Sequence, residues 1–166
     1  MVPVRDWAAI DPGVRGIGLA LFRDSELAEA YYVSGCPFED ENWLDLWSDF
    51  RVSQVWIERP EVYPGRQKGD PNDLISLGIV AGAVWAALHP TCKPEFVFPR
   101  RWKGRVSKEE TTARTRAELT AVELENVALP RAAALGHNVW DAIGLGLWVA
   151  GRIEGPTATP RSPTRG

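Results

Sequence analysis

The order of apolar segments along the chain is the sequence feature that most constrains its fold. Three apolar runs come first, and the turn-forming Asp11-Pro12-Gly13 directly follows the first of them. Such runs with short turns between them predict three strands of an antiparallel meander. The chain then alternates between segments of helical and of strand-like pattern. The five predicted strands cover residues 7–10, 17–22, 27–33, 52–57 and 95–98.

Four segments have helical character. In residues 37–50, Trp43, Leu46, Trp47 and Phe50 recur at helical spacing. The next helix is apolar nearly all round, so we expect it to be buried on more than one side, with Asn72 or Asp73 as its N-cap. The last three predicted helices cover residues 74–88, 108–125 and 139–150. Together the pattern predicts a mixed α/β fold in which helices cover both faces of a five-stranded sheet.

The length of 166 residues fits a single domain. We expect residues 1–155 to form it and residues 156–166, rich in Pro, Thr and Arg, to be a disordered tail. The two cysteines, Cys36 and Cys92, have no paired spacing, which excludes a disulfide framework and a zinc site. The most apolar stretch falls short of the roughly 20 residues of a membrane span. We therefore expect a cytoplasmic protein that does not enter the membrane.

Charge is distributed unevenly along a chain whose formal net charge is only −3. Residues 24–61 hold ten acids and two bases, whereas residues 99–116 hold seven bases and two acids. The basic segment could bind a polyanion such as a nucleic acid. The same charges also fit a solvent-exposed loop and helix face, so charge alone does not decide between these interpretations.

Three carboxylates occupy unusual places. Asp11 and Glu58 each directly follow a predicted strand, and Asp141 is the only formal charge between residues 131 and 152. A buried, unpaired carboxylate costs several kcal/mol, so Asp141 needs a partner. A divalent cation shared with the other two acids meets that need, because hard oxygen ligands suit Mg²⁺ or Mn²⁺.

Each acid also has a structural explanation. Asp11 could start a turn, and Glu58 could pair with Arg59 or with a base of the basic segment. Asn138 and Asp141 have the spacing of a capping box. These explanations do not account for three acids at the ends of two neighbouring strands and on the facing helix. A metal site predicts that joint placement.

Four motifs, taken in order, resemble the RuvC-type Holliday junction resolvases of the RNase H-like superfamily. Asp11-Pro12-Gly13 with residues 16–20 is similar to the first strand pair of these enzymes. Residues 58–65 with 69–75 resemble the bacteriophage-type members, and residues 99–103 and 137–142 fit the same pattern. The resemblance covers about residues 7–150 and implies an RNase H-like fold.

The resemblance implies that Asp11, Glu58 and Asp141 are metal ligands. The family places an Asp or His three residues before the last ligand, where this chain has Asn138, with His137 beside it. We prefer His137 as the residue that completes the catalytic site, with Asn138 as the alternative. Two Mg²⁺ ions, or Mn²⁺ as a substitute, would then support phosphodiester hydrolysis that leaves 5′-phosphate ends.

The resemblance also implies DNA contacts and a dimer. The basic segment would bind backbone phosphates, and Tyr63 would stack on an unpaired base. The residues expected to contact DNA are Arg66, Lys68, Arg100, Arg101, Lys103, Arg105, Lys108 and Tyr63. We expect Trp102 to be buried rather than stacked on DNA, and His89 to end its helix as a C-cap. The family is dimeric, and residues 74–88 would contribute to the homodimer interface.

We expect a metal-dependent, structure-selective endodeoxyribonuclease that resolves four-way and other branched DNA by paired nicks, in DNA recombination and repair. One alternative is an RNase H-like ribonuclease acting on structured RNA. Another is a catalytically idle nucleic-acid-binding module. A sugar-kinase-like ATPase shares the first motif, but the chain is too short for the paired domains of such enzymes.

Overall fold

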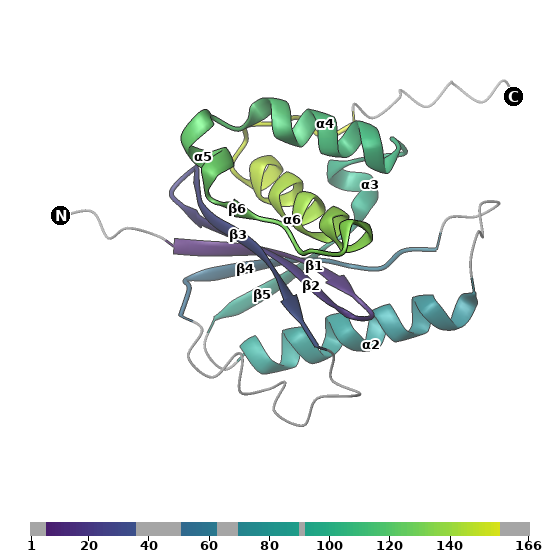
Figure 1. The fold of residues 1–166 in the computed structure, drawn as a ribbon. Coiled ribbons are helices and arrows are strands. Elements are labelled where there is room, and N and C mark those ends of the chain that lie inside the picture. Colours follow the sequence, from purple (N-terminus) through teal and green to yellow (C-terminus); the bar gives the residue numbers. More distant parts are fainter. Residues whose placement is uncertain (1–5, 36–50, 63–69, 90–91, 157–166) are drawn as a thin grey trace, which may run out of the picture.

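Six strands form one mixed sheet in the order β5-β4-β1-β2-β3-β6, as Figure 1 shows. A computed structural model describes residues 6–35, 51–62, 70–89 and 92–156. The strands are β1 (Asp6–Gly13), β2 (Gly16–Arg23), β3 (Glu26–Ser34), β4 (Gln54–Glu58), β5 (Lys93–Val97) and β6 (Val127–Ala128). β1, β2 and β3 pair antiparallel, so the predicted meander is confirmed. β4 runs parallel to β1 and β5 parallel to β4.

The predicted class of fold is confirmed, but the sheet has one strand more than expected. β6 adds to the free edge of β3 through two residues, Val127 and Ala128. Two residues are too few for an alternating pattern to stand out in a sequence.

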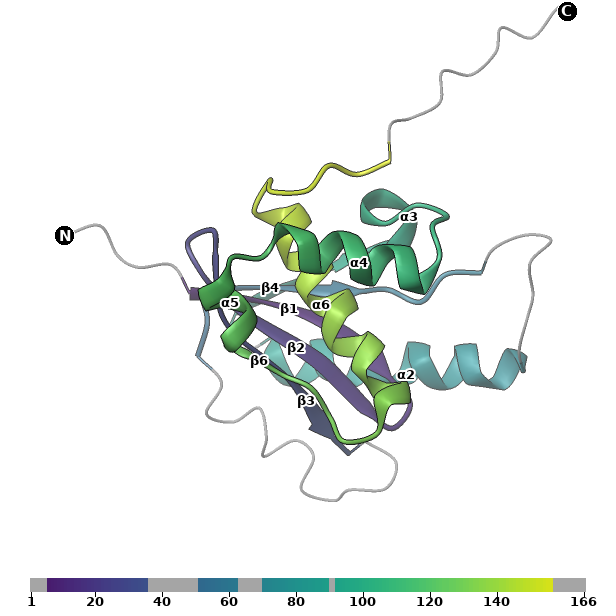
Figure 2. The ribbon, with the colours of Figure 1, turned by 45° about the horizontal axis from the view of Figure 1, so that its top comes forward.

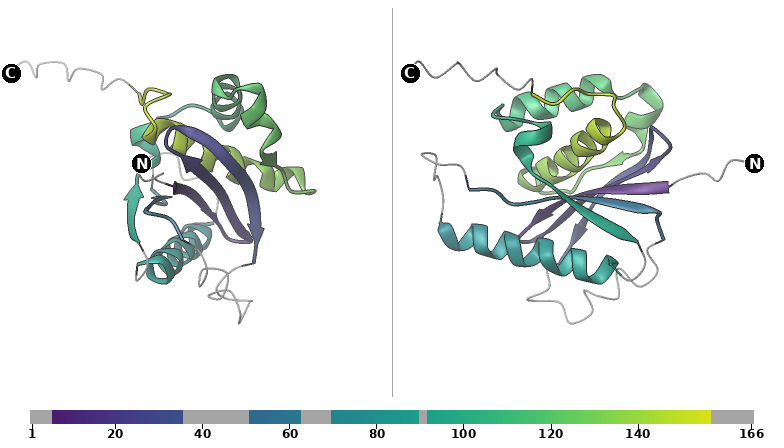
Figure 3. Two further views of the ribbon diagram at one scale, coloured as in Figure 1. Left: turned by 90° about the vertical axis from the view of Figure 1, so that its left-hand side faces the viewer. Right: turned by 180° about the vertical axis from the view of Figure 1, so that it is seen from behind.

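Helices cover both faces of the sheet, and Figures 1 and 3 show the two layers. α2 (Pro71–Leu88) lies on one face, while the longest helix on the other is α6 (Gly136–Val149). Three shorter helices surround α6, namely α3 (Pro99–Trp102), α4 (Lys108–Glu118) and α5 (Ala121–Glu125). Figure 2 shows α6 crossing the strands beneath α4. A hydrophobic core lies on each face of the sheet. Successive side chains of β1 point to opposite faces and contribute to both cores: Ala8 and Ile10 pack toward α2, whereas Ala9 packs toward α6.

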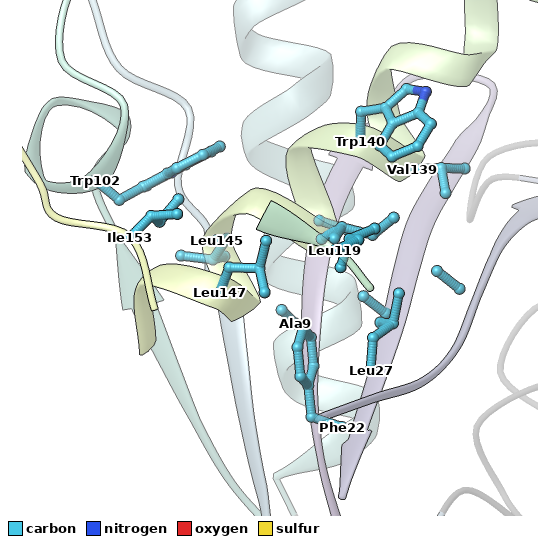
Figure 4. Close-up of a cluster of buried hydrophobic side chains, with 14 of the residues drawn as sticks. Ala9, Phe22, Leu27, Trp102, Leu119, Val139, Trp140, Leu145, Leu147 and Ile153 are labelled. Atoms are coloured by element: carbon cyan, nitrogen blue, oxygen red, sulfur yellow. The ribbon is translucent and has the colours of Figure 1, made fainter. Parts of the chain in front are cut away.

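α6 lies unusually close to the sheet. A Cβ atom built on Gly18 would stand 2.0 Å from the backbone oxygen of Asn138, and one on Gly146 would stand 2.1 Å from the Phe22 ring. Only glycine therefore fits at these two crossings. Figure 4 shows the core that results, with Phe22 of β2 and Leu145 of α6 among its buried side chains. The same close approach brings the first turns of α6 over the end of β1.

Several predicted boundaries are corrected. The single helix expected over 108–125 is two helices, because Leu119 and Thr120 are extended and Thr120 caps α5 in a capping box with Glu123. α2 begins at Pro71 and is capped by Asp70 rather than by Asn72 or Asp73. α6 begins at Gly136, three residues earlier than expected. The helix expected over 37–50 and the tail after residue 156 lie outside the described residues.

α2 is buried on one side only. Val80, Ala81 and Val84 are at most 2% exposed against the sheet, whereas Ile75 and Ile79 are 61% and 48% exposed. By length and composition alone, α2 is the one helix in the described part of the chain that could cross a membrane, with a mean hydropathy of 1.4. Core helices pass the same test, and α2 packs as one layer of the α/β fold.

Candidate metal centre and nucleic-acid cleft

Asp11, Glu58 and Asp141 converge in space. β1 and β4 are neighbouring parallel strands in which Ile10 pairs with Ile57, so the next residue of each strand is an acid at the same edge of the sheet. α6 brings Asp141 over that edge. One ligand oxygen from each of the three carboxylates lies within 4.8 Å of the others. The expected convergence is confirmed, and Asp11 lies within β1 rather than starting a turn.

The three carboxylates are nearly inaccessible to solvent. Asp11, Glu58 and Asp141 are 6%, 9% and 6% exposed. Burial, followed by the charges of Glu58 and Asp141, raises the pKa of Asp11 well above its ordinary value. Burial also raises the pKa of Glu58, although nearby Lys103 opposes the shift. Anions crowded in this way are stable only when a proton or a cation compensates them.

Lys103 supplies such a cation. Its Nζ lies 2.9 Å from Oε1 of Glu58 and 2.7 Å from Oδ2 of Asp141. Burial alone would lower the pKa of this lysine, but Glu58 and Asp141 outweigh that effect and raise it. Glu58 therefore pairs with a base of the basic segment, as one of its structural explanations foresaw. Lys103 here contacts acids, and its contact with DNA stays a prediction.

The indole of Trp102 orients Glu58, a contact that was not predicted from the sequence. Nε1 of Trp102, which is 1% exposed, donates a hydrogen bond to Oε2 of Glu58 at 2.8 Å. The expectation that Trp102 is buried is confirmed. Its hydrogen bond to Glu58 could not be predicted, because a buried indole requires an acceptor but the sequence does not specify which one.

Of the two residues considered as a fourth ligand, only Asn138 contacts the acids. Its Nδ2 donates to Oδ2 of Asp11 at 2.8 Å. His137 lines the same cavity, but its Nδ1 lies 2.6 Å from the backbone oxygen of Ala134. Which of the two completes the metal site stays a prediction, because the Asn138 contact is a hydrogen bond from its amide nitrogen and both residues line the cavity. The capping-box explanation of Asn138 and Asp141 is wrong, because the N-cap of α6 is Leu135, which makes no side-chain cap.

A cavity of about 510 Å³ opens over the carboxylates. Besides the acids and Lys103, its walls include Arg15, Tyr32, Lys108 and His137. The cavity joins the carboxyl ends of β1 and β4 to the start of α6. In open α/β sheets, ligands bind at the carboxyl ends of the strands.

The other residues predicted to bind DNA are placed in different ways. Arg100 pairs with Glu61 at 2.9 Å, and Arg101 lies over the Trp148 ring. Arg105 and Lys108 are exposed. Tyr63, Arg66 and Lys68 lie outside the described residues. The predicted C-cap is confirmed: His89 ends α2, with its ring 4.5 Å from that of Trp85.

The chain is similar in structure to known proteins. No protein-family model and no curated protein matches the chain. Among solved structures, the chain is similar to T. thermophilus RuvC in complex with a Holliday junction substrate, with a TM-score of 0.59, 22% identity, and 86% of this chain and 90% of that chain covered. A second Thermus thermophilus RuvC structure gives a TM-score of 0.56 at 22% identity, covering 86% and 91%. The chain therefore has the RNase H-like fold of RuvC.

Proposed function

We propose that this protein is a metal-dependent, structure-selective endodeoxyribonuclease that resolves four-way DNA junctions. The observation that carries the proposal is the cluster of three buried carboxylates, within 4.8 Å of one another, on the floor of a cavity in a RuvC-like fold. The similar T. thermophilus protein is bound to a Holliday junction. That likeness supports branched DNA, rather than structured RNA, as the substrate.

The residues present fit a divalent metal. Asp11, Glu58 and Asp141 offer hard oxygen donors close enough to share ions, since coordination bonds are about 2.0–2.6 Å long. The Lys103 ammonium between Glu58 and Asp141 indicates that the cluster accepts a cation. We propose two Mg²⁺ ions per site, with Mn²⁺ as a substitute. When bound, they would supply Lewis acidity and a nucleophilic water at neutral pH.

The chain's own residues prepare the site for that chemistry. Trp102 and Asn138 hold Glu58 and Asp11 by hydrogen bonds, which fixes the orientation of both carboxylates. Lys103 brings a positive charge close to the place where phosphate oxygens would gather, and charge stabilisation there lowers the barrier to hydrolysis. Cleavage would leave a 5′-phosphate and a 3′-hydroxyl.

We propose a homodimer formed through α2. Its solvent-facing side presents Ile75 and Ile79, and no atom of the described residues lies within 4 Å of a Cβ built on Gly78 or Gly82. An apolar, smooth face of this kind suits close packing against a second copy. A two-fold dimer would offer two equivalent clefts to a two-fold symmetric junction, which accounts for paired nicks. We place the protein in the cytoplasm.

A cleavage assay on an end-labelled four-way junction tests the proposed function. We expect symmetric nicks in Mg²⁺ or Mn²⁺ and none in EDTA. Asp11→Asn should abolish cleavage while junction binding persists, and Glu125→Gln, an exposed acid on α5, should cleave normally. Linear duplex DNA, an RNA–DNA hybrid and structured RNA serve as competing substrates. Preferred cleavage of structured RNA, or full activity of Asp11→Asn, would refute the proposal.

A further inference from the structure

The turn between β1 and β2 places an arginine at the rim of the carboxylate cavity. Gly13 pairs with Gly16, which leaves Val14 and Arg15 as the tip of this hairpin. Arg15 is exposed and lines the cavity that holds Asp11. The backbone N–H of Gly35 donates to the Arg15 oxygen at 3.1 Å and ties the tip to the end of β3. The position of Arg15 is therefore fixed by the sheet.

Tyr32 of β3 lies next to the hairpin tip and in the same row of the sheet as Asp11. Asp11 pairs with Gly18, and Gly18 pairs with Tyr32, so these three residues form one row across β1, β2 and β3. Strands lie about 4.8 Å apart, which puts Tyr32 about 10 Å from Asp11. A Cβ built on Gly16 would stand 2.6 Å from the Tyr32 hydroxyl, so the phenol lies against the base of the hairpin tip.

Three bases of the described residues line the cavity, namely Arg15, Lys103 and Lys108. Lys103 is paired with Glu58 and Asp141, and Lys108 belongs to α4, which leaves Arg15 as the base on the hairpin side of the carboxylates. Arg15 forms no ion pair with any residue in the described part of the chain. Burial raises the pKa of the Tyr32 phenol, and the nearby charge of Arg15 opposes that shift. An exposed guanidinium without an acidic partner remains available for a phosphate, which it can bind through two parallel hydrogen bonds.

We propose that Arg15 is a positioning residue that binds a backbone phosphate of the cleaved strand on the hairpin side of the carboxylates. The inference rests on the proposed function. Arg15 stands at the hairpin tip beyond the part of β1 that carries Asp11, so this phosphate would be a neighbour of the scissile one and not the scissile phosphate itself. Arg15 would thus fix the direction in which the strand enters the cleft.

The test is the salt dependence of junction binding, measured by fluorescence anisotropy in EDTA so that no cleavage occurs. Arg15→Gln should lower the slope of log affinity against log salt concentration by about 0.9 and weaken binding roughly five- to tenfold at 0.1 M salt. Arg15→Lys should restore the slope, because it restores the charge. Arg23→Gln, an exposed arginine at the far end of β2 and outside both the cavity and the basic segment, is the matched control and should bind as wild type does.

The outcomes separate the two proposals. A wild-type slope for Arg15→Gln, with normal wild-type binding and cleavage, overturns the role of Arg15 and leaves the proposed function standing. A slope that falls equally in Arg15→Gln and Arg23→Gln also overturns it, because the effect would then be one of net charge. Wild-type protein that neither binds nor cleaves the junction overturns the proposed function and this inference with it.

Discussion

Replacing Lys103 with methionine should make the stability of this protein depend on metal. The Nζ atom lies 2.9 Å and 2.7 Å from two carboxylate oxygens, and the lysine side chain is 19% exposed. At an effective dielectric constant of about 20, each contact corresponds to roughly 6 kcal/mol of gross attraction. Desolvation offsets most of it, and removal of one partner from a buried ion pair typically costs about 3–5 kcal/mol.

Lys103 is the main group that opposes the raised pKa of Glu58, so its removal raises that pKa further, and proton uptake by the acids should reduce the cost. We therefore expect Lys103→Met to lose about 3 kcal/mol of unfolding free energy in EDTA at pH 8. Excess Mg²⁺ should restore much of the loss, since a ligand at 100 times its Kd stabilises the folded state by about 2.7 kcal/mol.

Urea unfolding followed by tryptophan fluorescence measures both quantities. Lys108→Met, at an exposed lysine in the same basic segment, is the control and should stay within about 0.5 kcal/mol of wild type. An equal loss for Lys103→Met in EDTA and in Mg²⁺ would contradict the reasoning, because it would mean that metal does not replace the ammonium.

Three further predictions concern the elements that build the site. Because the pKa values of Asp11 and Glu58 are raised, the stabilising effect of their protonation is complete below the ordinary values of 3.8 and 4.5 and is lost as pH rises through the raised values. Metal-free protein should therefore lose stability with rising pH in that window, and Mg²⁺ should flatten the dependence in a thermal denaturation series. Glu123, whose pKa Arg152 lowers to about 2, contributes in the opposite direction: its stabilisation is present above pH 4.5 and is lost as pH falls toward 2. Glu123→Gln should cost about 3 kcal/mol at neutral pH in urea unfolding, and an unchanged midpoint would contradict a stabilising role for the ion pair between Glu123 of α5 and Arg152, which follows α6. Gly18→Ala should cost about 3 kcal/mol or more, because the new Cβ overlaps the backbone of α6, and a wild-type melting temperature would show that α6 does not pack so closely.

The parts of the fold that were predictable depend on local patterns. The meander was predicted because apolar runs and turn-forming residues alternate over short distances, although the turn after the first run lies at Val14 and Arg15, just beyond the predicted Asp11-Pro12-Gly13. Asp11 and Glu58 were identified because each follows an apolar run predicted to be a strand, and the neighbouring parallel strands β1 and β4 bring the two acids side by side. The break between α4 and α5 was missed, although Thr120 and Glu123 have capping-box spacing, because helical residues continue on both sides of it.

What was missed depends on contacts between distant segments. Lys103 is separated from Glu58 by 45 residues and from Asp141 by 38, and no spacing rule predicts such a pair. The positions of the His137 and Asn138 side chains depend on where α6 begins. A short 3-10 helix (Ala133–Leu135) leads directly into α6, which turns Asn138 toward Asp11 and leaves His137 against Ala134.

The central claim is that Asp11, Glu58 and Asp141 together hold divalent metal. Anomalous diffraction from crystals soaked in Mn²⁺ tests it most directly. We predict anomalous peaks between these three carboxylates, with manganese–oxygen distances of about 2.0–2.6 Å, and with Lys103 displaced from Asp141. Crystals that show Mn²⁺ elsewhere, with the Lys103 ammonium still between Glu58 and Asp141, would contradict the account.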